Sequence, residues 1–552
     1  MLPVTTSAAV ADLIWLLARG LVASCAGLVL CVAVIATYRL FLHPLACVPG
    51  PTCAAVSNIW QARNVRNGRM AELAKTLHQQ YGEVVRVGPD EVWFNSKEAF
   101  NQIYSPGKGY EKSDFYRELR NAPAEFTQLM LAVATCLNRP RLDWRLRPHF
   151  QDTLDLLSER DVRRYRLQRK MIGRTYHVSN VIKFEAAVDG VLERVVHKLE
   201  SLQGAEVDLK EWMHIIAVEC LGACVLSWSP GMLREGSDWG TISHSYQAWR
   251  RKSFFGLFPI LTKLELWSPG IGRAFARLCG VTYQTPENFR SFFPDVNRRV
   301  IRRLKSALRA NPAKDDRQDL LADLIQLHKD KPEFNETYLK KMAVTNFGAG
   351  HETMASTLTS VLAMIGSHPR TQMQVTREVR NAPGGVAAYG HAAKLPYTRA
   401  ATKEAMRLYP VLAMSLPRKA PADGLHVHGR WIPPNTTVGC NPVALHRNEA
   451  IFGPHAEAFD PTRWLLSAET SAERLRMRER YSLAWGGGAR TCPGRNLAEL
   501  VVFKVVAGLL ARFDVEVTTM PPEEAQRTYF LSMLTGVKVK FLPAAGFPEP
   551  RE

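Results

Sequence analysis

The sequence predicts a mainly α-helical protein with a minor β part, arranged as a single large domain behind one transmembrane helix. Most of the chain carries apolar residues at the spacing of a helix. Two short segments alternate apolar and polar residues as strands do, and one uncharged apolar run lies near the start. With 552 residues, 46% hydrophobic and 22% charged, the chain can bury a large core, which excludes a disordered chain, a collagen or a small disulfide scaffold.

The first element is a membrane segment. Gly20–Thr37 carries no charged residue, and the apolar pattern extends back to Leu13 with Arg19 as its interruption. A helix over about 13–37 is long enough to cross the hydrocarbon core, which takes about 20 residues. A cleaved signal peptide is the alternative, but the apolar run is too long and lacks a small-residue cleavage site.

Arginines follow the apolar run, beginning at Arg39, and the positive-inside tendency therefore places the bulk of the chain in the cytosol. Pro44, Pro49 and Pro51 come next, and because proline fixes its own backbone angle they predict a stiff connector. We find no repeat and no second linker after this connector. We therefore expect a membrane anchor at 1–39, a Pro-rich hinge at 40–55, one domain at 56–545 and a tail at 546–552.

Within the domain, the apolar spacing predicts both strands and helices. Alternation predicts strands with a Gly-Pro-Asp turn at Glu83–Phe94 and further strands at Leu425–Val438. Helical periodicity predicts the longer helices Met70–Tyr81, Val181–Leu202, Glu211–Leu226, Leu339–Gly366 and Leu497–Phe513.

The charge balance points to an anionic partner. Lys and Arg number 71 against 52 Asp and Glu, which gives a net charge of +19. Nucleic acid, a membrane surface or an acidic protein would each fit, and so would a purely solubilising surface. The ten cysteines are scattered without the spacing of a zinc site, as is typical of a protein from a reducing compartment.

The strongest chemical signal is the segment WGGGARTCPG, which stands directly before an apolar helical stretch. A helix start offers free N–H groups and a positive dipole end, and both lower the pKa of a thiol such as that of Cys492. Gly488 and Gly494 allow the backbone to approach a flat ligand closely, and Arg490 can reach an anionic group on that ligand. A buried structural cysteine beside a turn is the alternative.

This segment resembles the haem-binding signature of the cytochrome P450 family, F-x-x-G-x-R-x-C-x-G. Gly488, Arg490, Cys492 and Gly494 match the signature, and Trp485 stands in place of its phenylalanine. The resemblance implies a haem b (iron protoporphyrin IX) with the Cys492 thiolate as its axial metal ligand, in one haem-thiolate monooxygenase domain. We expect the tryptophan to change the packing over the proximal sulfur and to leave the ligand in place.

The segment AGHET, inside a long helical run, resembles the distal helix of the same family. A carboxylate beside a hydroxyl suits a proton relay. The resemblance implies that Ala349 and Gly350 leave room for O₂ and that Glu352 and Thr353 are catalytic residues that relay protons so that the O–O bond is cleaved. Met354 departs from the family's Thr or Ser, which removes one polar contact. Without the resemblance, an ordinary helix with a glycine bend and an exposed glutamate would be the favoured interpretation.

A further motif is expected to be structural. Glu404 and Arg407 lie three residues apart on one helix face, and the family has an E-x-x-R helix at this distance before its cysteine. Phe459–Trp464, FDPTRW, is similar to the family's PERF segment, with Thr462 in place of glutamate and Arg463 retained. The resemblance implies a buried triad of Glu404, Arg407 and Arg463 that fixes the core around the haem.

The basic run Arg160–Arg174 resembles the family's C helix, in which a W/H-x-x-x-R pair reaches a haem propionate. We align Arg164 with the first position and Gln168 with the second, which leaves Arg169 as a candidate propionate ligand. Arg418 matches the family's other propionate arginine. The basic run could also dock the acidic flavin domain of a reductase, or it could be a solvated basic face.

The resemblance covers nearly the whole chain and is closest to filamentous-fungal microsomal members of specialised-metabolite pathways. It implies insertion of one oxygen atom from O₂ into a lipophilic small molecule such as a terpenoid, polyketide or alkaloid. Electrons would come from NADPH through a separate flavoprotein reductase, and cytochrome b5 could contribute. The expected location is the endoplasmic reticulum membrane, with a single pass and a cytosolic catalytic domain.

The substrate pocket is expected to use variable segments of the chain, with an apolar lining. These segments lie at about 105–150, Trp249–Leu266, Val411–Leu416 and Tyr529–Leu534. The apolar part of the second one, Ser253–Leu264, could dip into the bilayer or belong to the core.

Three other functions compete with a monooxygenase. A haem-thiolate isomerase or dehydratase would work without O₂ and reductase, and the retained Glu352 and Thr353 argue against it. A non-catalytic membrane-bound haem- or ligand-binding protein is disfavoured by the intact Cys492 loop. A nucleic-acid binder rests on charge alone, and we find no nucleic-acid-binding motif beside the membrane anchor.

Overall fold

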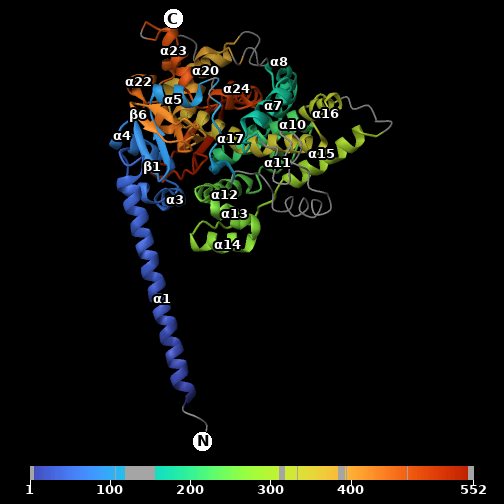
Figure 1. Cartoon of the computed structure of the whole chain (residues 1–552). Coiled ribbons are helices and arrows are strands. Elements are labelled where there is room, and N and C mark those ends of the chain that lie inside the picture. The colour runs from blue at the N-terminus through green and yellow to red at the C-terminus, as the bar shows by residue number, and fades with distance from the viewer. Residues whose placement is uncertain are drawn as a thin grey trace.

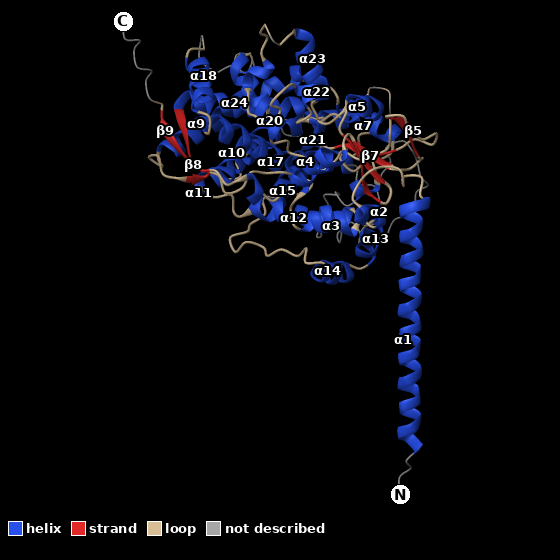
Figure 2. Cartoon of the chain, turned by 90° about the vertical axis from the view of Figure 1, so that its left-hand side faces the viewer, coloured by secondary structure: helices blue, strands red, loops and turns tan. Residues whose placement is uncertain are grey.

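The structure is a computed structural model that describes residues 5–105, 107, 109–117, 156–309, 317–331, 333–382, 392, 394–468 and 470–544. Helices form most of these residues and three small sheets form the β part, which confirms the predicted fold class (Figure 1 and Figure 2). Most of the expected pocket segment at 105–150 and the expected tail at 546–552 lie outside the described residues.

The helices and strands of the described chain have the following bounds. The helices are α1 (Thr5–Thr37), α2 (Thr52–Val56), α3 (Ile59–Arg66), α4 (Met70–Tyr81), α5 (Lys97–Tyr104), α7 (Val162–Ile172), α8 (Val178–Val181), α9 (Glu185–Glu200), α10 (Leu209–Leu226), α11 (Met232–Glu235), α12 (Thr241–Gly256), α13 (Pro259–Trp267), α14 (Pro269–Leu278), α15 (Phe293–Ala307), α16 (Leu320–Asp330), α17 (Glu336–Gly366), α18 (Pro369–Arg380), α20 (Pro396–Leu408), α21 (Pro442–Leu445), α22 (Glu449–Phe452), α23 (Ala472–Tyr481) and α24 (Arg495–Arg512). The strands are β1 (Val84–Gly88), β2 (Glu91–Phe94), β3 (Val207–Asp208), β4 (Arg418–Lys419), β5 (Leu425–Val427), β6 (Arg430–Ile432), β7 (Thr437–Cys440), β8 (Phe513–Thr519) and β9 (Lys538–Pro543).

Polar caps decide where the long helices begin. The helix α4 has the predicted bounds, whereas α17 begins three residues before the predicted Leu339. The Asn335 side chain accepts a hydrogen bond from the backbone N–H of Tyr338 and so caps α17. Asp208 caps α10 in the same way, and this helix begins at Leu209, two residues before the predicted Glu211. The apolar periodicity alone therefore locates each helix but not its first turn.

The principal sheet has the strand order β1-β2-β7-β4. Its strands β1 and β2 pair antiparallel, as the Gly-Pro-Asp turn predicts, and β2 pairs parallel with β7. The strand β4 pairs with β7 and carries Arg418. Two smaller sheets, β3-β9-β8 and β5-β6, complete the β part of the described chain.

The helix α17 runs through the middle of the helical body, beside α10 (Figure 2). It also packs against α15, α16, α20 and α24. Almost all of its residues from Met354 to Ile365 are buried, and they join the main hydrophobic core. Because neighbouring helices hold α17 on several sides, its central residues are fixed in position relative to the elements that carry the other motifs.

The helix α1 projects away from the body (Figure 1). Ile14–Leu42 has a mean hydropathy of 2.4 and is unburied, and it is the one segment of the described chain that is long and apolar enough to cross a membrane. The helix starts at Thr5, earlier than the predicted 13, and ends at the predicted Thr37. Its 33 residues span about 50 Å, more than a bilayer core of about 30 Å. This element fits a single-pass membrane anchor.

The chain that follows α1 is fastened to the principal sheet by Arg86 of β1. The buried Arg86 guanidinium donates to the carbonyl oxygens of Arg39 at 2.9 Å, Leu45 at 3.3 Å and Pro89 at 2.9 Å. The backbone N–H of Arg86 also donates to the Pro49 carbonyl oxygen at 2.7 Å. The end of α1 and the proline-rich segment are therefore held by one side chain of the sheet.

Candidate active site

The cysteine loop is closed by backbone geometry that requires glycine. The N–H of Cys492 donates to the carbonyl oxygen of Trp485 at 2.8 Å, which closes the loop before α24. Gly486 and Gly488 have φ values of +80° and +60°, in the left-handed region. A Cβ on Gly488 would lie 1.9 Å from the Tyr104 carbonyl oxygen, so the loop packs against the end of α5 without room for a side chain.

The Cys492 sulfur lies at the start of α24, as predicted, but burial dominates its electrostatics. Burial raises the pKa of the Cys492 thiol, while the N–H groups of Gly494 and Arg495 and the charge of Arg169 lower it. The predicted effect of the helix start is therefore present and is outweighed. A stable thiolate here needs a further positive charge, which a haem iron would supply. Although it lies deep within the protein, the side chain faces open space rather than packed neighbours, as binding of a metal requires.

The central turn of α17 presents a second accessible surface. Ala349 is exposed and both Gly350 and Thr353 are half-buried, although their helix runs through the core. The Thr353 hydroxyl donates to the Ala349 carbonyl oxygen at 2.7 Å. A Cβ on Gly350 would lie 3.1 Å from the Leu221 side chain, so the glycine permits close packing of α17 on α10.

Tyr176 connects the surroundings of the cysteine to α17. Its hydroxyl donates to Asn346 Oδ1 at 2.8 Å, and its carbonyl oxygen accepts from Asn496 Nδ2 at 2.8 Å. Burial raises the pKa of the Tyr176 phenol, and the charge of Cys492 adds to this effect. Tyr176 thus links α17 to the start of α24, the helix that follows the cysteine loop.

Glu352 and Thr353 point to different partners. The Glu352 Oε1 atom accepts hydrogen bonds from Ser245 Oγ at 2.5 Å and from Trp249 Nε1 at 2.8 Å. The side chain is 4% exposed. The carboxylate of Glu352 is therefore held by α12, whereas the hydroxyl of Thr353 is held by the backbone of its own helix. The two groups predicted to relay protons are adjacent in sequence but do not share a hydrogen-bond partner among the described residues.

Two arginines lie together beside the cysteine loop. Arg490 donates to the carbonyl oxygens of Glu159 at 2.6 Å and Arg160 at 2.9 Å, and Arg418 is 4% exposed. Burial, and then the charge of Arg418, lowers the pKa of Arg490 to about 10. An anionic group between these cations would relieve their repulsion. The pair therefore fits the carboxylates of a haem.

The helix α7 places different residues at the site from those we aligned. Arg164 pairs with Glu159 at 3.2 Å, whereas the Tyr165 ring lies 3.9 Å from the Arg490 guanidinium. Burial raises the pKa of the Tyr165 phenol, and Arg169, Arg490 and then Arg418 lower it. Tyr165 and Arg169 thus have the W/H-x-x-x-R spacing, one residue after the expected Arg164 and Gln168. A shift of one residue turns a helix by about 100°, which explains the different partners.

The expected structural triad is present. Glu404 and Arg407 form a fully buried ion pair at 2.7 Å, and Arg463 Nε lies 3.2 Å from Glu404 Oε1. The indole of Trp464 also donates to Glu404 at 2.8 Å. Arg407 donates in addition to the carbonyl oxygen of His446 at 2.7 Å. The network therefore ties α20 to the chain that leads to the cysteine loop.

Comparison with known proteins decides the family. Residues 138–541 match the family model of cytochrome P450. The chain belongs to the cytochrome P450 family. It is 53% identical, over 92% of its length and 93% of the relative's, to the cytochrome P450 monooxygenase sdnT of Sordaria araneosa. It is 28% identical to the cytochrome P450 monooxygenase hepC of Aspergillus oryzae, over 89% and 91% of the two chains. A pisatin demethylase of Fusarium vanettenii is 27% identical over 87% and 85%.

These matches confirm the predicted family and class of enzyme. The P450 is a monooxygenase, and its family is one of haem-thiolate proteins. The cysteine at the start of α24, the buried Arg418 and the half-buried Arg490 are residues of this chain that fit such a group.

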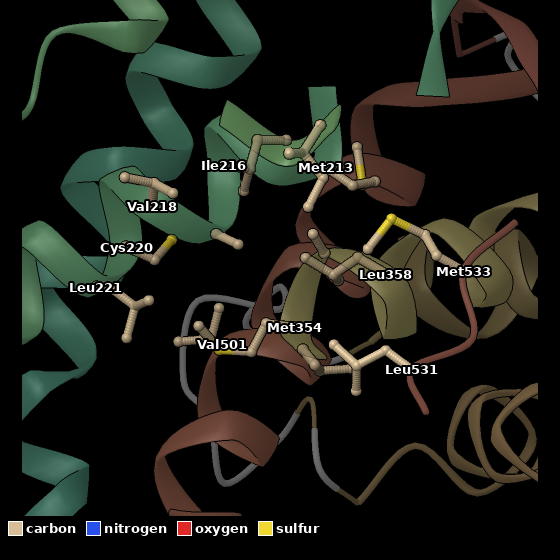
Figure 3. Packing of buried hydrophobic residues seen from close by; sticks show 14 of the residues in the cluster. Met213, Ile216, Val218, Cys220, Leu221, Met354, Leu358, Val501, Leu531 and Met533 are labelled. Atoms are coloured by element: carbon tan, nitrogen blue, oxygen red, sulfur yellow. The ribbon is translucent and has the colours of Figure 1, made fainter. Parts of the chain in front are cut away.

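Met354 of the P450 belongs to the core. Its side chain is buried among apolar side chains that include Leu221, Val501 and Leu531 (Figure 3). A threonine hydroxyl at this position would point into the same apolar cluster and would have to be satisfied locally by its own helix. The departure from the family pattern therefore exchanges a polar side chain for packing.

The expected pocket segments of the P450 meet around Phe530. Its ring centroid lies 5.4 Å from that of Phe115 and 5.5 Å from that of Trp249. Its carbonyl oxygen accepts from the N–H of Ala413 at 3.0 Å, and its own N–H donates to Ser253. Four segments far apart in sequence are thus brought together, and their aromatic surface suits an apolar ligand.

A cavity of about 590 Å³ lies on the side of the cysteine loop that faces α20. Trp485 and Gly488 form part of its wall, and the Arg495 guanidinium lies 5.7 Å from the Trp485 ring. Basic residues from three elements also line the cavity: Arg399, Lys403, Arg480 and Arg495. Lys403 pairs with Glu479 and Arg495 with Glu499, so two of these four cations are partly compensated.

Proposed function

We propose that this P450 inserts one oxygen atom from O₂ into a lipophilic small molecule, with a haem b held by Cys492 and electrons that come from NADPH through a separate reductase. The observation that carries the proposal is the pairing of an accessible cysteine at the start of α24 with an accessible turn of α17 next to Glu352 and Thr353. When bound, the haem supplies the activation of O₂ and the transfer of one oxygen atom.

The protein's part begins with holding the haem. Cys492 would bind the iron, and the N–H groups of Gly494 and Arg495 would stabilise the sulfur's charge. Arg418 and Arg490 would hold the propionates, with Arg169 beside them. The burial of these residues supports the proposal, because Arg418 is buried and Gly494, Arg490 and Arg169 are half-buried.

The proposed proton path uses Thr353 and Glu352. The Thr353 hydroxyl lies on the accessible side of α17 and can hold a proton there, because it now donates to a backbone carbonyl that it can release. Glu352 is the adjacent titratable group, and a turn of its side chain would bring a proton from the protein interior. Ala349 leaves space next to this hydroxyl, whereas Gly350 lies against Leu221 of α10.

The proposed substrate is a lipophilic specialised metabolite such as a terpenoid, polyketide or alkaloid. Phe115, Trp249 and Phe530 offer an aromatic wall. The relatives come from filamentous fungi, and one carries a name that says it demethylates pisatin. This support concerns the class of molecule only.

The proposed place of work is the endoplasmic reticulum membrane, with the catalytic body in the cytosol. The helices α13 and α14 lie on the side of the body from which α1 extends (Figure 1 and Figure 2). They carry Ile260, Trp267 and Leu278, which are 71%, 79% and 82% exposed. Large apolar side chains on this side favour contact with the lipid surface and entry of substrate from it.

The proposed docking site of the reductase is the cavity beside the cysteine loop. Its cations complement an acidic flavin domain and would speed association at low salt. Docking here would bring the electron donor to the sulfur side of the haem. Cytochrome b5 could use the same surface.

The deciding experiment compares the parent with Cys492→Ser in microsomes that contain a P450 reductase. We expect the parent, reduced and exposed to carbon monoxide, to show the absorption band of a thiolate haem, and the variant to lose both this band and all turnover in metabolite profiling. Oxidation of substrate by the variant at the parental rate would refute the assignment of the ligand. Product formation that persists without reductase or O₂ would instead indicate an isomerase or dehydratase.

A further inference from the structure

The helix α12 holds the carboxylate of Glu352. Ser245 and Trp249, one turn apart on α12, both donate to Glu352 Oε1, at 2.5 Å and 2.8 Å. Trp249 is buried and Ser245 is half-buried. Two hydrogen bonds to one charged oxygen fix the rotamer of the side chain. The direction in which Glu352 points is therefore set by α12 and not by α17, to which it belongs.

The same face of α12 contacts the aromatic cluster around Phe530, where the proposed substrate would bind. The Trp249 ring, whose N–H donates to Glu352, lies 5.5 Å from the ring of Phe530, at an interplanar angle of 30°. Ser253, one further turn along α12, accepts from the N–H of Phe530 at 3.0 Å. A molecule that presses on Phe530 therefore acts on the side chain that holds the carboxylate.

The start of α12 is tied to the residue next to Glu352. Asp238 accepts from the N–H groups of Gly240 and Ile242, both at 2.9 Å, and so caps α12. Its Oδ2 atom lies 3.2 Å from His214 Nδ1, and His214 Nε2 lies 3.0 Å from His351 Nδ1. The chain from Asp238 through His214 to His351 thus sets how α12 sits against α17 at this turn.

We infer that Ser245 and Trp249 are positioning residues that couple the substrate pocket to the supply of protons by Glu352. The inference rests on the proposed function of Glu352 as a proton carrier. While α12 is in place, the carboxylate is held toward Ser245 and Trp249. A displacement of Trp249 releases one of its two hydrogen bonds and lets the side chain turn toward Thr353. The step moves one proton and needs no oxidant or reductant beyond those of the monooxygenase.

The test uses the full-length P450 in microsomes with reductase, and compares Trp249→Phe, Ser245→Ala and the double variant with the parent. Two readouts are measured without added substrate: the solvent deuterium isotope effect on NADPH oxidation, and the C–O stretching frequency of the reduced carbon monoxide complex. Loss of both donors frees the carboxylate without substrate, so it is expected to speed NADPH oxidation by roughly 3- to 10-fold, a part of the usual contribution of a general acid. It should also lower the isotope effect and shift the C–O stretch.

Two matched control variants remove an indole N–H and a serine hydroxyl that do not contact Glu352. Trp93→Phe deletes an indole N–H that donates to Glu91 at 2.7 Å in the principal sheet. Ser243→Ala deletes a half-buried hydroxyl on α12 that accepts from Lys210. Both variants should keep the parental isotope effect and C–O stretch. Phenylalanine keeps most of the apolar volume of the indole. If the loss of volume alone caused the effect, Trp249→Phe and Trp93→Phe would change the two readouts alike.

Glu352→Gln separates the inference from the function on which it rests. If this variant slows NADPH oxidation but the double variant keeps the parental rate, isotope effect and stretch, the coupling through α12 is wrong and the role of Glu352 stands. If Glu352→Gln itself leaves the isotope effect unchanged, the proton-carrying role is wrong. Should the double variant lose the thiolate band, the single variants decide, and parental values in both would overturn the inference.

Discussion

At the scale of single residues, the buried titratable groups of this P450 are held in defined charge states by their hydrogen bonds. Arg490 is half-buried next to Arg418 and donates to two backbone carbonyls, so it stays a cation with donors fixed in place. His446 is the opposite case. Its Nδ1 atom lies 3.0 Å from the Arg407 carbonyl oxygen, and its Nε2 atom accepts from the N–H of Leu483 at 2.8 Å. Only a neutral ring can donate at one nitrogen and accept at the other.

His446 is expected to make the protein acid-sensitive. Burial lowers the pKa of His446 to about 3, so the folded state stays neutral at this ring while the unfolded chain takes up a proton below its ordinary pKa of about 6.5. The unfolded state therefore binds more protons between these values, and stability falls as the pH falls, by about 1.4 kcal/mol per pH unit.

The measurement is the thermal midpoint between pH 7 and pH 5. At pH 7, His446→Asn should have a lower thermal midpoint than the parent, but its midpoint should fall less between pH 7 and pH 5. The control His426→Asn, at an exposed position, should show the same fall in midpoint as the parent. Parallel pH dependence in His446→Asn and the parent would show that another group is responsible.

At the scale of elements, the spacing of apolar residues predicts where helices and strands lie. It does not predict which face of a mostly polar helix points to the site. The helix α4 and the hairpin of β1 and β2 were predictable because their apolar residues alternate with polar ones at the right spacing. The register of α7 was not, because Tyr165, Gln168 and Ile172 are its only buried residues and basic side chains surround them. Tyr165 could have been found by placing an aromatic residue, in place of Arg164, at the first position of the family's pair.

The parts of the candidate site that are set by short sequence motifs were predictable. The parts that depend on hydrogen bonds to distant segments were not. Cys492 and the triad of Glu404, Arg407 and Arg463 lie as their motifs predict. The partners of Glu352 were not predictable, since Ser245 lies more than a hundred residues earlier and belongs to no motif. Hydrogen bonds between distant helices follow from the packing of the whole domain.

The cysteine loop is expected to fail if Gly488 gains a side chain. A Cβ there would lie 1.9 Å from the Tyr104 carbonyl oxygen, on a backbone with φ of +60°. Gly488→Ala should therefore separate the loop from α5 and reduce the fraction of protein that gives the thiolate band by roughly 10-fold or more, since such strain costs on the order of 1–3 kcal/mol. Gly190→Ala on α9, where a Cβ meets nothing within 4 Å, is the control. Equal bands in the two variants would contradict the requirement for glycine.

At the scale of the whole molecule, the basic cavity and the exposed apolar side chains lie on different sides of the body. The cations around the cavity beside the cysteine loop belong to α20, α23 and α24. The exposed apolar side chains of α13 and α14 lie with α1 on another side (Figure 1). The proposed docking of a reductase and the proposed contact with the membrane would therefore not exclude each other.

Reversal of charge at the cavity should weaken the binding of the reductase to the P450. Lys403→Glu combined with Arg480→Glu is expected to raise the reductase concentration needed for half-maximal NADPH oxidation by roughly 5- to 20-fold at low salt, because two attractive charges become repulsive. The difference from the parent should shrink as salt is added. Arg234→Glu, an 84% exposed position on α11, is the control. An equal effect of Arg234→Glu would assign the loss to net charge and not to this surface.

Arg86 has a consequence for how firmly the apolar helix is attached. Since one guanidinium binds carbonyl oxygens of the chain just after α1 and of the proline-rich segment, this part of the chain cannot peel away from the sheet without breaking several hydrogen bonds. A substitution confined to Arg86 is therefore expected to loosen the attachment of α1 while every group around the sulfur stays unchanged.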